Sequence, residues 1–218
     1  MNTKSKDQKT TLEGKTKHWD NIRQQIDQVA KRGFRADPEL GELITGLSML
    51  GTQPRISVFG EVRDNSKHAT KRRVIAPRVW IEPEVDKKIE EKYKELRQNY
   101  SRVFEKSEKE GIAATQETDE EFIKARDELD EFNENLSLPH NVLTIKLFDL
   151  LTEFYQGRQA PYGAQISLSG FFERVMLENS GNHSLCIFTN AEQERKLKEY
   201  QDEFIAFGKF LKSKYFSE

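Results

Sequence analysis

The sequence predicts an α+β protein in which helices pack on a small antiparallel sheet of about four strands and an antiparallel helical hairpin protrudes. Three observations lead to this fold class. Apolar residues recur every three or four positions along most of the chain, which is typical of amphipathic helices. Short runs rich in β-branched and aromatic residues occur in two pairs, as expected of β-hairpins. Two neighbouring helical stretches carry heptad seams, which indicates that they pack against each other.

The composition indicates a packed core together with an extended, solvated part. Of the 218 residues, 35% are hydrophobic and 33% are charged, whereas the usual charged share is about a quarter. The 14 Phe, 6 Tyr and 2 Trp residues argue against a disordered chain, because disordered chains are poor in aromatic residues. We therefore expect a disordered tail at 1–15 and a single α+β domain at 16–218, with the helical hairpin inserted at about 84–136.

The first third of the chain predicts two helices and a β-hairpin. Apolar spacing indicates a helix over 17–32, and Asp37 is expected to cap the helix that follows it. The runs RISVFGEVR at 55–63 and RVIAPRVWIE at 73–82 are predicted strands with a polar connection between them. Because Pro77 lies inside the second strand and cannot donate to a ladder, that strand is expected to be an edge or to contain a bulge.

The middle of the chain predicts three helices. Helices at about 84–109 and 118–136 form the coiled-coil hairpin, and a third helix runs from Pro139 to Tyr155. The third helix is apolar nearly all round, which is typical of a helix at the centre of a domain. The seam residues of the hairpin are Ile89, Tyr93, Leu96, Tyr100 and Val103 in its first helix and Phe122, Ala125, Leu129, Phe132 and Leu136 in its second.

The last third predicts a second β-hairpin and a long helix. Residues 165–177 form the first predicted strand, in which Gly170 is a candidate for a bulge. Residues 184–188 are its expected partner strand, with Cys186 buried as a small hydrophobic residue. Residues 189–192 form a capping box that begins the last helix.

The sequence contains no motif that is specific for catalysis or for metal binding. The single cysteine excludes an internal disulfide and a cysteine metal cage. Glu61, His68, His140 and His183 are candidates for acid–base chemistry, but their spacing fits no metal or catalytic motif. We therefore expect no cofactor and no metal. Because no apolar run approaches 18 residues and no leader is recognised, we expect a cytoplasmic protein without membrane contact.

Charge is segregated along the chain although the formal net charge is only -2. Residues 55–78 hold seven basic and two acidic residues, concentrated around the first β-hairpin. These charges either keep the hairpin soluble and discourage edge pairing or bind an anion or a nucleic acid, because arginine forks match phosphate oxygens. The candidate contacts are Arg55, Arg63, Lys67, Lys71, Arg72, Arg73 and Arg78.

The opposite excess lies on the second helix of the helical hairpin. Residues 117–134 hold nine acidic and two basic residues. Three interpretations stay open: a solvated arm, a mimic of nucleic acid that binds a basic partner, or an internal partner of the basic β-hairpin.

The connection at 154–162 combines aromatic residues with an arginine. Tyr155, Arg158 and Tyr162 are candidates to line a shallow site for an anion or a base, and a purely structural corner is the alternative. Glu61 completes the possible pocket if the fold brings it near Arg158 or Tyr162, as a hydrolase or transferase site would require.

Parts of the chain resemble a group of small uncharacterised bacterial proteins. The resemblance rests on LGELITGLSMLG at 40–51, APRVWI at 76–81 and LL followed by FYQGR within 150–158, and it spans about 38–178. In that group the strand after the first of these motifs carries Ser-Cys-Glu-Gly-His, whereas residues 57–61 here read SVFGE, so only the Ser and the Gly agree. The resemblance implies the order of elements and no activity. If the group's Cys, Glu and His are functional, their replacement here argues against that function.

These patterns favour a non-enzymatic binding or regulatory protein that contacts a macromolecule through the charged helical hairpin and the basic β-hairpin. A protein partner is expected first. The alternatives are a nucleic-acid-binding protein that uses residues 55–78, an acidic inhibitor that mimics nucleic acid, and a hydrolase or transferase of unknown substrate. The oligomeric state stays open, as does whether the heptad seams close within one chain or between two.

Overall fold

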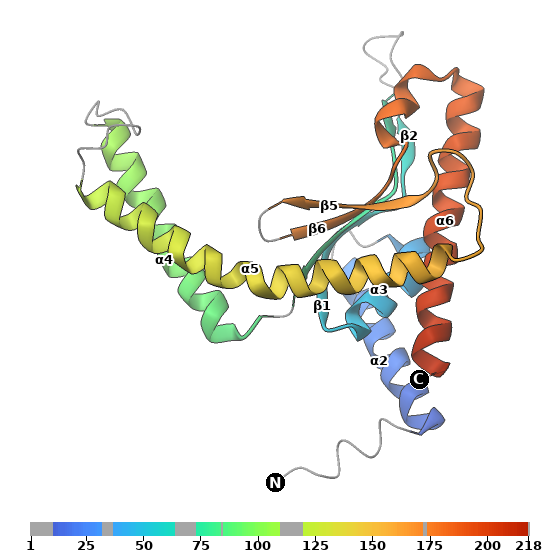
Figure 1. Ribbon diagram of the computed structural model, residues 1–218, viewed down its shortest axis with the longest axis horizontal. Coiled ribbons are helices and arrows are strands. Elements are labelled where there is room, and N and C mark those ends of the chain that lie inside the picture. The colour runs from blue at the N-terminus through green and yellow to red at the C-terminus, as the bar shows by residue number, and fades with distance from the viewer. Residues whose placement is uncertain are drawn as a thin grey trace. The chain divides into compact units, whose positions relative to one another are not determined.

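The computed structural model confirms the α+β fold (Figure 1) and divides into two compact units. One unit comprises Met1–Glu82 and Thr144–Glu218, and the other is Pro83–Leu143. The second unit is thus inserted into the sequence of the first, close to the 84–136 predicted for the helical hairpin. The structure describes residues 11–31, 37–63, 73–83, 85–109, 120–171 and 174–217.

Three α-helices of the first unit pack together along their apolar faces. They are α2 (Leu12–Lys31), α3 (Gly41–Met49) and α6 (Asn190–Ser217), and a 3₁₀-helix, η1 (Pro38–Leu40), leads into α3. Because α2 begins at Leu12, the end of the predicted tail at 1–15 is helical; residues 1–10 lie outside the described part of the chain.

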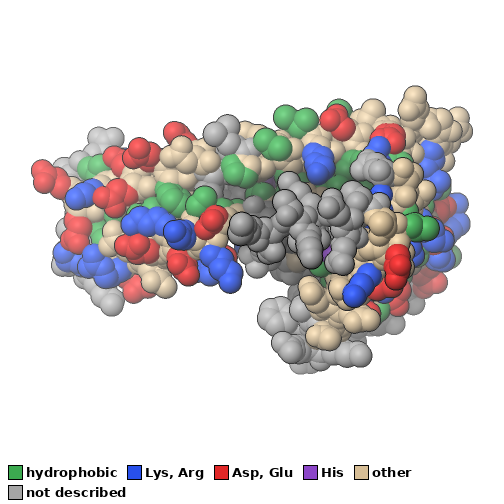
Figure 2. Space-filling model, turned by 90° about the horizontal axis from the view of Figure 1, so that it is seen from below, with side chains coloured by type: hydrophobic (Ala, Val, Ile, Leu, Met, Phe, Trp, Pro, Cys, Tyr) green, Lys and Arg blue, Asp and Glu red, His purple; other side chains and the backbone are tan. Residues whose placement is uncertain are grey.

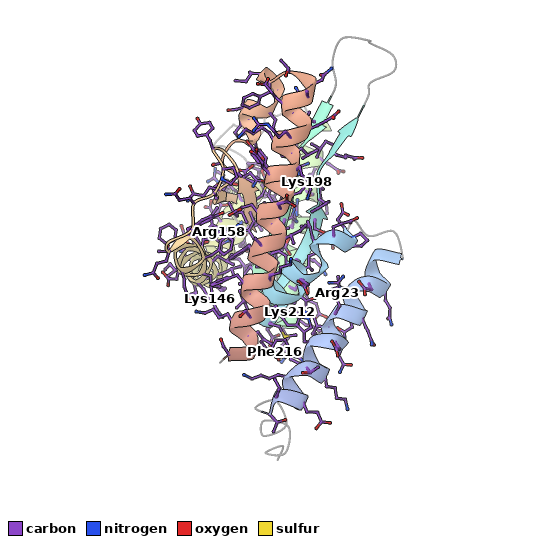
Figure 3. All side chains as sticks on the ribbon, turned by 90° about the vertical axis from the view of Figure 1, so that its right-hand side faces the viewer. Arg23, Lys146, Arg158, Lys198, Lys212 and Phe216 are labelled. Carbon is purple, nitrogen blue, oxygen red and sulfur yellow. The ribbon has the colours of Figure 1, made fainter. Side chains whose placement is uncertain are left out.

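Close approach of α3 and α6 forms the centre of this helical layer. A Cβ atom on Gly208 would lie 2.8 Å from the backbone N of Leu43, so only glycine allows this spacing. The rings of Phe204 and Phe207 on α6 are fully buried. Near the C-terminal end of α6, the ring of Phe216 packs against Trp19 of α2, with 5.8 Å between the ring centroids. Figure 3 labels Phe216 at this end of the helix.

The sheet of the first unit has four antiparallel strands in the order β1-β4-β6-β5. Its strands are β1 (Thr52–Val58), β4 (Arg78–Pro83), β5 (Ile166–Phe171) and β6 (Arg174–Asn179), and β2 (Glu61–Arg63) pairs with β3 (Arg73–Ile75) in a separate ladder. On one face of the sheet the side chains of Val79, Ile81, Val175 and Leu177 are completely or almost completely buried, so this face belongs to the core.

The first predicted β-hairpin exists, but each of its arms is divided into two strands. The expectation of an edge strand at Pro77 is wrong, since β4 lies inside the sheet between β1 and β6. Pro77 instead falls in the gap between β3 and β4, where a missing N–H costs no ladder bond. Gly60, in the matching gap of the other arm, has φ +96° and accepts a hydrogen bond on its carbonyl from Gln201 of α6.

The second predicted β-hairpin is formed by different residues. Residues 165–177 are not one strand: β5 and β6 both arise from this region and pair with each other, with Phe171 opposite Arg174. Gly170 faces Val175 in regular register and is not a bulge. The predicted strand at 184–188 is a 3₁₀-helix, η2 (Asn182–Ile187), in which Cys186 is exposed rather than buried. The capping box before α6 is confirmed, because Glu192 accepts hydrogen bonds from the backbone N–H and the hydroxyl of Thr189.

The second unit is an antiparallel helical hairpin closed within one chain. It consists of α4 (Lys87–Lys109) and the first part of α5 (Glu120–Tyr155). Aromatic contacts pair Tyr93 with Phe132 and Tyr100 with Phe122, so positions that ascend on α4 meet positions that descend on α5.

The predicted boundary at Pro139 is wrong, because α5 continues through it as one helix of 36 residues. A proline in a helix interior removes one backbone hydrogen bond and crowds the preceding turn. Packing on both sides of this position evidently outweighs that cost: Phe122 and Ala125 are buried before it, and Leu147 and Leu151 after it.

The second half of α5 is not surrounded by core, contrary to its all-round apolar sequence. One face carries the buried residues Leu143, Leu147, Leu150, Leu151 and Phe154. Three other apolar side chains, Val142, Ile145 and Phe148, are 66%, 62% and 63% exposed.

Asp37 joins η1 to β1 and does not cap η1 with its side chain. Its carboxylate accepts a hydrogen bond from the Phe59 N–H at 2.9 Å, and its own N–H donates to the Ser57 hydroxyl at 3.1 Å. Burial raises the pKa of the Asp37 carboxyl, and the neighbouring carboxylates Glu39 and Glu61 raise it further. A carboxyl whose pKa rises on folding contributes stability below its unfolded pKa, and that contribution disappears as the pH rises through the folded value.

We predict that Asp37→Asn stabilises the protein relative to wild type more at pH 7 than at pH 4. The amide keeps an acceptor for the Phe59 N–H but removes the negative charge that burial and Glu39 disfavour at neutral pH. Urea unfolding of both proteins at the two pH values measures the difference. Asp37→Ala is the control, since it loses the acceptor and should cost about 1 kcal/mol. A stability difference that is the same at both pH values would contradict the prediction.

Candidate functional site

A cavity of about 570 Å³ lies in the first unit, beside the end of α5 and the first half of α6. Such a volume falls within the roughly 300–1,000 Å³ of small-molecule sites. Its walls come from the connection between α5 and β5, the turn after β6, η2 and α6. The lining residues are Tyr155, Arg158, Ala160, Pro161, Tyr162, Gly163, Gln165, Ser180, Gly181, Ser184, Phe188 and Tyr200.

A buried polar face of α6 supports these walls. Lys196, Tyr200 and Glu203 are spaced four and three residues apart, which places them on one side of the helix. Their exposed fractions are only 9%, 1% and 2%. Each of the three side chains reaches the walls of the cavity, so α6 fixes the position of the connection between α5 and β5.

Glu203 binds Arg158 through two parallel hydrogen bonds. The Arg158 Nε donates to Oε1 at 3.0 Å and a terminal nitrogen donates to Oε2 at 2.9 Å. Hydrogen bonding to Glu203 raises the pKa of the Arg158 guanidinium. The guanidinium carbon also lies 4.9 Å from the centre of the Phe154 ring. Figure 3 shows Arg158 at the end of α5 beside α6.

Tyr155 extends the same network to the sheet. Its hydroxyl oxygen accepts a hydrogen bond from the Ile166 N–H, at the start of β5, at 2.7 Å. Burial raises the pKa of the Tyr155 phenol far above its ordinary value, and the Glu203 carboxylate adds to the increase. The Tyr155 hydroxyl thus links the end of α5 to the start of β5.

Lys196 and Tyr200 hold the other side of the connection. The Lys196 ammonium donates to the Tyr162 carbonyl at 2.9 Å. The Tyr200 hydroxyl lies where side chains on two glycines would be: a Cβ on Gly181 would be 2.0 Å from it and one on Gly163 2.6 Å. The Gly181 N–H also donates to the Gly163 carbonyl at 2.9 Å. The two glycines thus let the connection and the turn after β6 meet around this hydroxyl.

The described residues that line the cavity are mainly aromatic and polar. None of them is an acid, a histidine or a cysteine. What the lining does offer is aromatic rings, hydroxyls and a side-chain amide around a guanidinium that is already paired.

The structure brings together three of the four residues predicted for the pocket. Tyr155, Arg158 and Tyr162 line the cavity, and Glu61 does not. Glu61 is exposed on β2, where it lies opposite Ile75 of β3. Its negative charge contributes to the raised pKa of Asp37. The acid that binds Arg158 is Glu203, so the predicted pocket that combines Glu61 with Arg158 or Tyr162 is not formed.

Sequence reasoning missed Glu203 and Lys196. Each precedes a buried seam residue of α6, Phe204 and Leu197, and charged residues at the margin of a helix seam usually reach solvent. The available signal was that Lys196 and Glu203 are seven residues apart with Tyr200 between them, which puts a base and an acid on one helix face.

The basic β-hairpin falls largely outside the described residues, so its predicted role stays a prediction. Lys67, Lys71 and Arg72 lie outside them, as does His68, and for Arg55, Arg63 and Arg73 only the backbone is described. Arg63 and Arg73 face each other in the β2–β3 ladder. Arg78 is exposed on β4, opposite Glu178 of β6.

The helical hairpin displays its charges to solvent. Figure 2 shows acidic and basic side chains mixed over its surface, with hydrophobic ones between the helices. Within the described part of α5 before Pro139, all seven acidic residues are exposed. Glu121 pairs with Lys106 of α4 at 2.9 Å and with Arg102 at 3.4 Å, so part of this acidity is balanced inside the hairpin.

Comparisons with protein-family models, with curated proteins and with solved structures gave no match. The resemblance to the small bacterial proteins therefore stays a prediction. Among the residues that the structure describes, no helix is long and apolar enough to cross a membrane. In the same residues no group of three or more His, Cys, Asp or Glu side chains is placed to hold a metal ion.

We predict that Arg158→Ala destabilises the protein by about 2 kcal/mol, because it leaves the Glu203 carboxylate buried without its partner. The loss should be smaller than the roughly 3–5 kcal/mol of a fully buried pair, since the Arg158 side chain is 40% exposed. Denaturant unfolding measures it. The double variant Arg158→Ala/Glu203→Gln is the matched control and should be more stable than Arg158→Ala alone. If Arg158→Ala unfolds like wild type, the pair contributes nothing to stability.

Proposed function

We propose that this chain is a non-enzymatic binding or regulatory protein whose partner is another protein, bound on the exposed face of α5. The supporting observation is the apolar surface of that helix. Ile145 and Phe148, both in the first unit, are 62% and 63% exposed. Hydrophobic side chains at the surface along α5 are visible in Figure 2.

Exposed apolar residues are ordinary when they are scattered singly, but a contiguous group of them indicates an interaction surface. Ile145 and Phe148 lie three residues apart on one helix, so a partner can cover them together. Burying them would also account for a helix whose sequence is apolar nearly all round.

Charge indicates the chemistry of the partner. The part of α5 that precedes the apolar residues carries seven acidic and two basic residues between 120 and 135. Glu120, Asp127, Glu131 and Glu134 recur at spacings of seven, four and three, which places them on one helix face. We infer a partner that offers an apolar surface to Ile145 and Phe148 and a basic surface to these acids.

The double variant Ile145→Ser/Phe148→Ser is expected to keep the stability of wild type within about 0.5 kcal/mol, because both side chains are mostly in solvent. It is also expected to weaken partner binding about 30-fold or more, as removal of a central hydrophobic contact does. The partner is first identified by placing a photo-crosslinking amino acid at position 148 in living cells, then purified and titrated against both proteins. Exposed Lys209 on α6 is the control position for crosslinking.

The acidic part is tested with the same purified partner. Asp127→Asn/Glu131→Gln should weaken binding and reduce its dependence on salt. Sedimentation velocity on the chain alone decides the competing occupant: a dimer that the serine variant dissociates would assign this face to a second copy and overturn the proposal. So would equal crosslinking from positions 148 and 209, or an affinity that the serine variant leaves unchanged.

A further inference from the structure

We infer that the cavity beside α6 is a binding site for a small uncharged molecule built on a planar heteroaromatic ring, of the nucleobase or nucleoside class. The site is separate from the α5 face proposed for a protein partner, since neither Ile145 nor Phe148 lines it. Its assignment therefore does not depend on that proposal.

Aromatic rings provide the surfaces on which such a molecule would stack. Tyr162 lines the cavity with a side chain that is 86% exposed, while Phe188 is half-buried on the η2 side. A large aromatic ring that stays in solvent contributes nothing to folding through burial. Its presence beside a cavity fits stacking on a ligand, which contributes to base binding without needing a particular base.

Polar groups around the rings match the edge of a base. Ser180 and Ser184 contribute hydroxyls, which both donate and accept, and Gln165 contributes an amide with both kinds of group. Ring nitrogens, exocyclic amines and carbonyls on a base need such mixed partners. A purely anionic ligand would need donors alone.

The charge of the cavity argues against an anion. Arg158 is the only charged residue among those that line it, and two nitrogens of its guanidinium bind Glu203 at 3.0 and 2.9 Å. The Glu203 carboxylate neutralises the guanidinium charge and occupies two of its five N–H donors, so the described lining residues carry no uncompensated positive charge for a phosphate. Of the two ligands that the sequence left open, an anion or a base, the structure favours the base.

The walls are held in place before any ligand arrives. Buried Lys196, Tyr200 and Glu203 position the connection from one helix, and the Asn179 amide donates to the Ala164 carbonyl at 2.6 Å from β6. Buried charged groups cost solvation free energy that a hydrophobic corner would avoid. Their use here keeps the ring-bearing segment in one conformation, and such preorganisation favours binding of small ligands.

The test is chemical-shift titration of the ¹⁵N-labelled full chain with adenosine, guanosine, cytidine and uridine, each also as its 5′-monophosphate. At least one nucleoside is expected to shift the amides of Gly163, Gly181 and Ser184, and its monophosphate to bind within about threefold of it. Tyr162→Ala should weaken this binding about tenfold or more through lost stacking. Tyr162→Phe keeps the ring and should bind within about twofold of wild type. Because Tyr162 is 86% exposed, neither change should disturb folding.

Three outcomes would overturn the inference. The first is no shift of the cavity amides with any nucleoside at millimolar concentration. The second is that inorganic phosphate shifts them and a monophosphate binds at least tenfold more tightly than its nucleoside, which would define an anion site. The third is that glucose binds as well as the nucleosides, or that Tyr162→Ala leaves the affinity unchanged. A single-stranded tetranucleotide identifies the source of the base: tighter binding than the nucleoside indicates a base within a strand, and weaker binding a free molecule.

Discussion

The ion pair between Glu203 and Arg158 is the interaction on which the connection between α5 and β5, and the cavity beside it, depend. Glu203 is almost fully buried in the middle of a helix that otherwise presents aromatic and aliphatic side chains. A carboxylate in such a place requires a cation and further hydrogen bonds, because its desolvation is costly without them. Arg158 meets this requirement, and Tyr155 carries the network on to β5. The path of the chain from α5 to β5 is thus set by electrostatics, and the cavity forms along that path.

Lys196 and Tyr200 lie one to two helical turns nearer the start of α6 than Glu203. Their polar groups also hold the connection between α5 and β5 in place. The Lys196 ammonium binds the Glu199 carboxylate on its own helix and the Tyr162 carbonyl of the connection, so its contact with the connection depends on the main chain and not on the side chain at position 162. The Tyr200 hydroxyl lies so close to positions 163 and 181 that neither has room for a Cβ atom, and both are glycine. The cavity beside α6 thus combines walls that are held in place with an aromatic side chain, Tyr162, that is exposed to solvent. That combination is typical of binding sites, where a preformed surface is kept at some expense of folding free energy.

The two candidate surfaces differ in the physics that identifies them. On α5 the signal is apolar area that the chain itself does not cover, and the driving force for a partner is its removal from water. In the cavity the signal is buried polar structure beneath an exposed ring, and the driving force is stacking and hydrogen bonding. A chain with both can bind a small molecule and a protein independently. Coupling between them would require the ligand to change the affinity for the partner, which separate titrations can measure.

The sequence by itself determined the elements whose signal is local. The heptad seams of the helical hairpin and the capping box before α6 were readable because helix periodicity and capping involve only near neighbours. The sequence also identified Tyr155, Arg158 and Tyr162 as candidate lining residues of one site, because they lie within eight residues of one another. Only the tertiary structure decided that Glu203 rather than Glu61 meets Arg158, that Pro139 lies within one helix, and that residues 184–187 are helical. Each of these depends on contacts between distant segments, and such contacts can override local propensity.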